Sequence, residues 1–215
     1  MSRISGQITL LVTILAFFFL LTGCGNKSDT NPGTLNEKKE MNLDINQSWI
    51  NWTVNKNNGK HTGTLKFLKG NFRIESGVPV SGTCIVDLNS INLIDVKDSA
   101  ENRRIVDIIK SKNFLNTEKY PLSTVSIRSI VPLRYEKMPT INTTVKGSLT
   151  VKDSTLPMVV SAFTRYSKDS VVTNANFSFL SRLWNIPFKS LNIDKDFKEN
   201  PYDDELDMEI YIVAK

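Results

Sequence analysis

Few side chains in this sequence belong to the types that carry out catalysis or bind metals. His61 is the only histidine in the chain, and Cys24 and Cys84 are its two cysteines. A zinc site would need further His or Cys ligands at a recognisable spacing, and no such set accompanies His61. A general base would need a Ser or Cys nucleophile motif, which the sequence does not contain. We therefore expect His61 to form a hydrogen bond at the start of a strand, and we predict no enzymatic activity, no metal site and no cofactor.

A second candidate for chemistry is the thiol of Cys24, which follows an apolar segment. Met1-Ser2-Arg3 is a short positive head, and Ile8–Leu21 is an apolar run of 14 residues interrupted only by two threonines. A helix needs about 20 apolar residues to cross the core of a bilayer, so this run is more typical of a secretory signal peptide. Residues 1–23 are therefore predicted to be a signal peptide.

The residues around the predicted cleavage point suggest what happens to this thiol. Leu21-Thr22-Gly23-Cys24 resembles the lipobox of bacterial lipoproteins. The resemblance implies that Cys24 receives a diacylglyceryl group and that a peptidase cleaves the chain in front of it. Two or three acyl chains anchor a protein durably, since each buried methylene contributes about 0.8 kcal/mol. The alternatives are an ordinary signal peptide with an incidental cysteine and a transmembrane anchor.

The residues after the cysteine bear on the membrane that carries the anchor. Gly25 and Asn26 lack the aspartate that often retains lipoproteins at the inner membrane. The sequence thus favours a lipid-anchored protein of the bacterial cell envelope, on the periplasmic side of the outer membrane.

Charge and cysteine content argue against two other classes of protein. The formal net charge is +5, and loss of residues 1–23 leaves +4 because Arg3 is their only charged residue. So small a surplus, spread along the chain, does not indicate a nucleic-acid partner. Once Cys24 is acylated, Cys84 has no partner for an internal disulfide. We expect a hydrophobic core to hold the domain together, with Cys84 as a small buried apolar side chain.

Beyond Cys24 the sequence divides into a tether and a folded domain. Residues 24–46 are rich in Asn, Lys, Glu, Gly and Pro, a composition typical of a flexible tether. The folded domain is expected to span residues 47–215. Within it, apolar and polar residues mostly alternate, which indicates strands with one buried face. The predicted strands are Trp49–Val54, Thr62–Lys69, Gly82–Asn89, Leu122–Val131, Thr144–Val151, Pro157–Arg165, Val171–Phe179 and Leu206–Ile212.

One segment has the periodicity of a helix instead. Asp98, three residues before a glutamate, resembles the start of a capping box, and Ile105, Ile108 and Ile109 then share one helical face. This pattern predicts one short helix over Ser99–Lys112. About eight antiparallel strands with short turns and one helix favour a mainly all-β fold, an eight-stranded antiparallel barrel. Such a barrel is just wide enough to be filled by its own side chains or to hold one ligand.

Several short motifs follow one another in a characteristic order along the domain. They are Trp49 and Trp52 before His61-Thr62-Gly63, Gly82 before Val86-Asp87-Leu88, Lys110-Ser111, Phe114, Lys119-Tyr120-Pro121, Val145–Val151, Pro157 and Arg182. In order and spacing they resemble the YceI-like polyisoprenoid-binding family. The resemblance implies an extended lipocalin-like barrel, without an active site, whose apolar interior holds an isoprenoid or similar lipid. Trp184-Asn185-Ile186 departs from the family's pattern, so the rim of the pocket is expected to differ.

Apolar side chains that face the interior are the candidate ligand contacts. They are Leu65, Phe67, Phe72, Val86, Leu88, Leu149, Phe163, Phe177, Phe179, Ile210 and Ile212. The alternative for all of them is that they only pack against one another. Arg182 is expected either to meet a ligand headgroup or to pair with one of the acids Asp203, Asp204 and Glu205 and so close the barrel.

The leading hypothesis is a non-catalytic carrier that holds a long isoprenoid or fatty-acyl lipid inside its barrel, anchored to the membrane through Cys24. The alternative is an envelope protein–protein interaction module whose barrel is filled by its own side chains. A homodimer is compatible with either hypothesis, and the sequence does not identify the lipid.

Overall fold

The computed structural model describes residues 38–56, 59–133, 140–186, 188 and 202–215. The predicted signal peptide, Cys24 and the first part of the predicted tether lie outside the described residues. No helix within the described ranges combines the length and the apolar character needed to span a membrane. The elements follow the order β1 (Lys38–Asn42), β2 (Trp49–Lys56), β3 (Gly59–Glu75), β4 (Val78–Leu93), α2 (Ser99–Lys110), β5 (Leu122–Pro132), β6 (Thr143–Val151), β7 (Ser154–Tyr166), β8 (Val171–Leu180), the 3₁₀ helix η1 (Ser181–Trp184) and β9 (Tyr202–Ala214).

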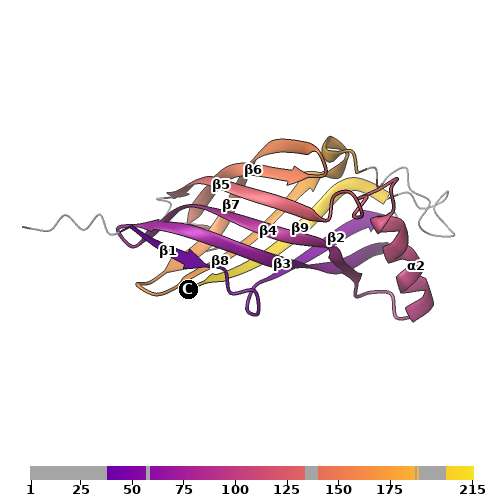
Figure 1. Cartoon of the computed structure of the whole chain (residues 1–215), viewed down its shortest axis with the longest axis horizontal. Coiled ribbons are helices and arrows are strands. Elements are labelled where there is room, and N and C mark those ends of the chain that lie inside the picture. Colours follow the sequence, from indigo (N-terminus) through magenta and orange to yellow (C-terminus); the bar gives the residue numbers. More distant parts are fainter. Residues whose placement is uncertain (1–37, 57–58, 134–139, 187, 189–201) are drawn as a thin grey trace, which may run out of the picture. The chain divides into compact units, whose positions relative to one another are not determined.

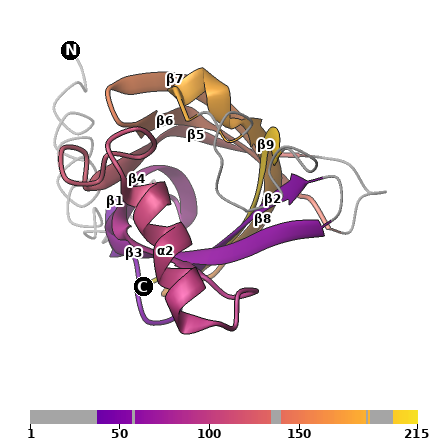
Figure 2. The same cartoon turned by 90° about the vertical axis from the view of Figure 1, so that its right-hand side faces the viewer.

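These strands form one antiparallel sheet that closes on itself. Its order is β1-β3-β2-β9-β8-β7-β6-β5-β4, and a further pairing of β3 with β4 joins the two sides. Figure 2 looks at the closed ring from the end at which α2 lies. Each strand of the ring has hydrogen-bonded neighbours on both sides, although β7 and β8 pair only from Ala162–Ala175 to Tyr166–Val171. The prediction of an eight-stranded antiparallel barrel is confirmed, with β2 to β9 as its eight strands.

The short strand β1 does not add a ninth position to the ring. Because β4 pairs along nearly the whole of β3, β1 and β2 must share the other edge of β3. β1 pairs there from Lys38–Glu75 to Asn42–Asn71, and β2 pairs from Ile50–Leu65 onward. β1 and β2 are therefore two halves of one strand, interrupted by a turn.

The turn between β1 and β2 is held by a single carboxylate. Asp44 accepts hydrogen bonds from the backbone of Asn46 and Gln47, at 3.1 and 3.2 Å, and from Lys215 Nζ at 3.1 Å. The hydrogen bond from Lys215 is the largest cause of a lowered pKa of the Asp44 carboxyl. The turn thus links the start of the barrel to its C-terminal end.

The position of β1 corrects the predicted boundary of the domain. The sequence interpretation placed residues 38–46 in the tether and began the barrel at Gln47. In the structure Met41 is fully buried and Leu43 is nearly so, and the backbone of Asn42 exchanges hydrogen bonds with Lys215. Met41 and Leu43 are separated by one residue, so both side chains point to the same face of the strand. Two apolar residues among many charges were too weak a signal to predict this strand.

The helix lies across one end of the barrel, as Figures 1 and 2 show, and begins at the predicted cap. Asp98 Oδ1 accepts hydrogen bonds from the backbone N–H groups of Ala100 and Glu101. The buried face consists of Ile105, Val106 and Ile109. The helix ends at Lys110, two residues before the predicted end, because Ser111 adopts an extended backbone with ψ of 162°.

The buried side chains form two main clusters at opposite ends of the barrel. One cluster combines the buried face of α2 with side chains such as Trp52, Leu93 and Phe114. The other contains Met41 and Phe72 and lies at the end that carries β1 (Figure 1). A ligand site inside the barrel would lie between these two clusters.

Candidate ligand-binding cavity

The interior of the barrel is hollow between its two ends. The cavity offers about 140 Å³ to the centres of water-sized molecules, and side chains from all eight strands of the ring line it. A void that holds one water needs only roughly 10–15 Å³. The barrel is therefore not filled by its own side chains.

Most of the predicted ligand contacts line this cavity. The nine that do so are Leu65, Phe67, Val86, Leu88, Leu149, Phe177, Phe179, Ile210 and Ile212. Each lies on the inward-facing side of its strand, and the strand register brings several of them together. In the register of β9, Ile210 pairs with Ala175 on β8 and with Ile50 on β2.

Two of the predicted contacts lie elsewhere. Phe72 is buried, but it packs with Met41 and Ile74 in the cluster at the far end of the barrel. Phe163 is only partly buried and pairs with the exposed Asn174 on the outer side of the sheet. The prediction that Phe163 faces the interior is wrong, because the positions next to it on β7 face inward instead.

Both neighbours of Phe163 on β7 face inward, and one of them is a threonine. Thr164 is 2% exposed, and its hydroxyl lies 3.0 Å from the Thr143 hydroxyl. The Thr143 hydroxyl also donates a hydrogen bond to the backbone oxygen of Ala162. Because both hydroxyls have partners, they can be buried without a large free-energy cost. Thr164 therefore faces the interior and Phe163 faces outward, the opposite of the orientation that the sequence analysis predicted for Phe163.

Other lining residues were not predicted. Ile50, Trp52 and Met208 lie on strands, and the alternation of those strands would have identified them. Phe114 and Phe188 lie outside the strands, where the sequence has no periodicity to indicate which side chains face inward. These two phenylalanines form an edge-to-face pair with ring centroids 4.6 Å apart.

Loop segments near α2 are joined by a lysine and a tryptophan. Lys152 Nζ donates hydrogen bonds to the backbone oxygens of Phe114 and Asn185, at 2.9 and 3.1 Å. Trp184 is buried and donates its indole N–H to the backbone oxygen of Leu149 at 3.0 Å. The residues that depart from the family's pattern therefore anchor this end of the cavity wall, and Ile186 lines the cavity itself.

A glycine on the neighbouring strand makes room for Trp52. Trp52 on β2 pairs with Gly63 on β3. A Cβ atom at Gly63 would lie 2.4 Å from Cζ2 of the indole ring and 2.1 Å from the backbone oxygen of Asn92. Any other residue at this position would collide with the ring or the backbone. The pair Trp52–Gly63 thus fixes the indole ring over the sheet beside the cavity.

The cavity wall is almost entirely apolar. No lining residue in the described part of the chain carries a charged side chain. The hydroxyl of Ser123 is turned away from a ligand role, because it donates a hydrogen bond to the backbone oxygen of Thr150 at 2.7 Å. Burial raises the pKa of the Cys84 thiol to about 12, so the thiol is neutral at physiological pH. Such a wall favours hydrocarbon over water or ions.

Arg182 forms an ion pair and His61 a side-chain hydrogen bond, both outside the lining of the cavity. Arg182 is more than half exposed, and its Nε lies 3.7 Å from Asp204 Oδ2. His61 Nδ1 lies 2.6 Å from Asp95 Oδ2, and the other oxygen of Asp95 accepts a hydrogen bond from the Thr62 backbone. Among the described residues no group of three or more His, Cys, Asp or Glu side chains is arranged to hold a metal ion.

The closed eight-stranded ring and the apolar cavity inside it define a lipocalin-like barrel. Residues 41–214 match the model of the YceI-like domain, and the chain belongs to this family. A comparison with curated proteins found no match.

Solved structures show the same fold. The crystal structure of BcnA from Burkholderia cenocepacia is 18% identical, with a TM-score of 0.62 over 80% of this chain and 99% of that one. A polyisoprenoid binding domain from Saccharophagus degradans, described as implicated in plant cell wall breakdown, is 13% identical. Its TM-score is 0.54, over 81% of this chain and 97% of that one.

Proposed function

We propose that this chain is a non-catalytic binding protein that holds the hydrocarbon chain of a long isoprenoid or acyl lipid inside its barrel. The observation that carries the proposal is the hollow interior, whose described wall contains no charged side chain. Each methylene transferred from water into such a wall contributes about 0.8 kcal/mol. A lipid tail therefore needs no polar anchor to bind firmly along a dry cavity.

The family and the fold support the same proposal. The chain belongs to the YceI-like domain family, and a protein of similar fold is described as a polyisoprenoid binding domain. At 13% identity that likeness extends to the fold alone, so the ligand of this chain is proposed from its own cavity.

The test is the lipid content of the full chain. We expect chain purified from a bacterial host to release a lipid on organic extraction, detected by mass spectrometry. Met158 lines the cavity, whereas the adjacent Val159 is 68% exposed on the outer face. The variant Met158→Glu should lose the lipid because it places a carboxylate in the apolar wall. The matched control Val159→Glu should keep it. Wild-type protein that carries no lipid from several membrane extracts would favour a protein–protein interaction module instead.

We further propose that the barrel is attached to the bacterial cell envelope by lipid on Cys24, on the periplasmic side of the outer membrane. The support is the sequence Leu21-Thr22-Gly23-Cys24 and the apolar run before it. Metabolic labelling with an alkyne fatty acid tests the anchor. Label should disappear in Cys24→Ser and persist in Cys84→Ser, the matched control. Label that persists in Cys24→Ser would exclude attachment at this residue.

A further inference from the structure

Two neighbouring strands of the ring pair along only part of their length. β7 and β8 pair from Ala162–Ala175 to Tyr166–Val171. The first part of β7 pairs only with β6, and the last part of β8 pairs only with β9. Among the described residues, segments 154–161 of β7 and 176–180 of β8 therefore have a sheet neighbour on one side only. We call this unpaired stretch of the barrel wall the β7–β8 gap.

The β7–β8 gap borders the cavity from both of its sides. Met158 belongs to the unpaired segment of β7, Phe177 and Phe179 belong to that of β8, and all three line the cavity. Met158 and Phe177 also pack against one small buried cluster, which contains the residues of the first cross-strand pair, Ala162 and Ala175. At the gap the described wall is therefore held by contacts between side chains. Its opening would break no backbone hydrogen bond between β7 and β8.

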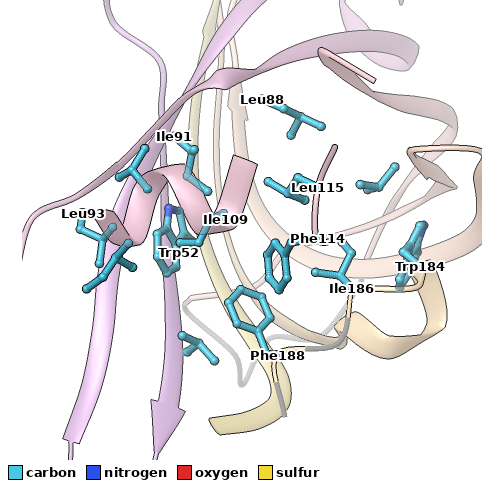
Figure 3. Packing of buried hydrophobic residues seen from close by; sticks show 14 residues of the cluster. Trp52, Leu88, Ile91, Leu93, Ile109, Phe114, Leu115, Trp184, Ile186 and Phe188 are labelled. Atoms are coloured by element: carbon cyan, nitrogen blue, oxygen red, sulfur yellow. The ribbon is translucent and has the colours of Figure 1, made fainter. Parts of the chain in front are cut away.

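The other places at which a lipid could enter provide a contrast. β4 and β5 also do not pair over residues 78–81 and 128–131, but none of these residues lines the cavity. One end of the barrel is covered by α2 and its cluster, and Figure 3 shows Ile109 of the helix near Trp52 and Phe114. The opposite end is filled by the cluster that contains Met41. Entry at either end would displace buried side chains together with a helix or a strand.

The two segments at the gap suit a polar group as well as hydrocarbon. A strand without a neighbour on one side presents a row of free N–H and C=O groups there. Pro157 lies in the unpaired part of β7, and proline is confined to strand positions whose N–H is not needed by the sheet. Neither segment 154–161 nor segment 176–180 contains a charged residue, although 23% of the chain is charged. The gap thus offers hydrogen bonds without a charge.

We propose that the lipid enters the barrel tail first through the β7–β8 gap and that its polar end stays in the gap, hydrogen-bonded to the two free strand edges. The inference rests on the proposed function and adds the place of the polar end. A hydroxyl fits these edges, because they both donate and accept hydrogen bonds. Inside the cavity a polar end would be desolvated against an apolar wall. Met158 is suited to move aside, since a methionine side chain is flexible.

Two photoreactive alcohols of equal length locate the polar end. Both are analogues of 1-dodecanol, with a diazirine either at carbon 2, beside the hydroxyl, or at carbon 11, near the end of the tail. Each is bound to the delipidated full chain and irradiated, and the labelled residues are identified by mass spectrometry of peptides. We expect the carbon-2 probe to label segments 154–161 or 176–180. The carbon-11 probe should label lining residues outside both segments.

Association rates test the route of entry with a matched pair of substitutions. Met158 borders the gap, whereas Met208 lines the cavity from β9, which pairs with strands on both sides. Met158→Ala should raise the association rate of 1-dodecanol at least about threefold, because it widens the passage that limits binding. Met208→Ala should leave this rate within about twofold and act on dissociation. Stopped-flow tryptophan fluorescence measures both rates, since Trp52 lines the cavity. The labelling of the wild-type chain decides independently of how the variants fold.

The outcomes separate this inference from the proposed function. If the carbon-2 probe binds but labels residues near α2 or near β1, the gap is refuted as the site of the polar end, and the lipid-binding proposal stands. If both probes label the same residues, a fixed orientation of the lipid is refuted. Equal association rates in the two methionine variants would refute entry through the gap. If neither alcohol binds, the inference and the proposed function are both refuted.

Discussion

The thiol of Cys84 gives a quantitative test of how dry the cavity is. Cys84 is 1% exposed and lines the cavity, and burial raises the pKa of its thiol from an ordinary 9.0 to about 12. The test uses a small uncharged disulfide that reacts with thiols, 2,2′-dithiodipyridine, added to the variant Cys24→Ser. In this variant Cys84 is the only thiol, since the chain has two cysteines.

The expected rate follows from the pKa. At pH 8, about one thiol in ten is ionised at a pKa of 9.0 and about one in ten thousand at a pKa of 12, and only the thiolate reacts. The more basic thiolate is intrinsically the better nucleophile, which restores roughly 20-fold over three pH units. Folded Cys84 should therefore react about 50-fold more slowly than the unfolded chain, before any further slowing from its burial.

The assay is the absorbance of the released thiopyridone, with the same variant unfolded in guanidinium as reference. Between pH 7 and 10 the rate of the folded chain should rise tenfold per pH unit, while that of the unfolded chain levels off near pH 9. A folded rate within threefold of the unfolded rate at pH 8 would refute the burial argument. A folded rate that levels off near pH 9 would show that the thiol reacts only after the barrel opens.

Three further perturbations test the fold. Met41→Ala should lower the free energy of unfolding by about 2–5 kcal/mol in urea titrations, because Met41 is fully buried. The control Glu40→Ala, at the exposed neighbouring position, should change it by less than about 0.5 kcal/mol. Equal effects of the two substitutions would place β1 outside the barrel. Asp98→Ala should cost about 0.5–2 kcal/mol in the same assay, since it removes the N-cap of α2, and no loss would contradict the cap. Between pH 8 and pH 10 the wild-type protein should lose about 1.4 kcal/mol of its free energy of unfolding relative to Cys84→Ala. The reason is that the unfolded thiol loses its proton near pH 9, while the folded thiol, with its raised pKa, keeps it. If the free energies of unfolding of the two proteins change in parallel with pH, the raised pKa is refuted.

The strands and most of the cavity wall were predictable because alternation carries local information. On β8 the inward side chains Ala175, Phe177 and Phe179 alternate with exposed polar residues, and each position can be assigned from its neighbours alone. The prediction failed at Phe163 because it followed the aromatic residue type: the alternation of β7 places Val160, Ala162 and Thr164 inside and Phe163 outside. The inward Thr164 is accommodated by the hydroxyl of Thr143 on β6, a partner from another strand.

The strand β1 and the α2 end of the cavity show a second limit. Met41 becomes a core residue only because β3 and β9 place Phe72 and Ala214 against it. Phe114 and Phe188 belong to segments without regular periodicity and meet only in the folded chain. Predicting either feature requires the three-dimensional arrangement.

The sequence by itself determined the class of fold, the antiparallel strands, the cap of the helix and the lack of a recognisable catalytic motif. All of these depend on residue types at fixed short spacings. Only the tertiary structure decided that the barrel is hollow and that the indole N–H of Trp52 has no acceptor among the described residues. The physical reason is that free volume and hydrogen-bond partners are sums over side chains from every strand of the ring, which no single segment of the chain specifies.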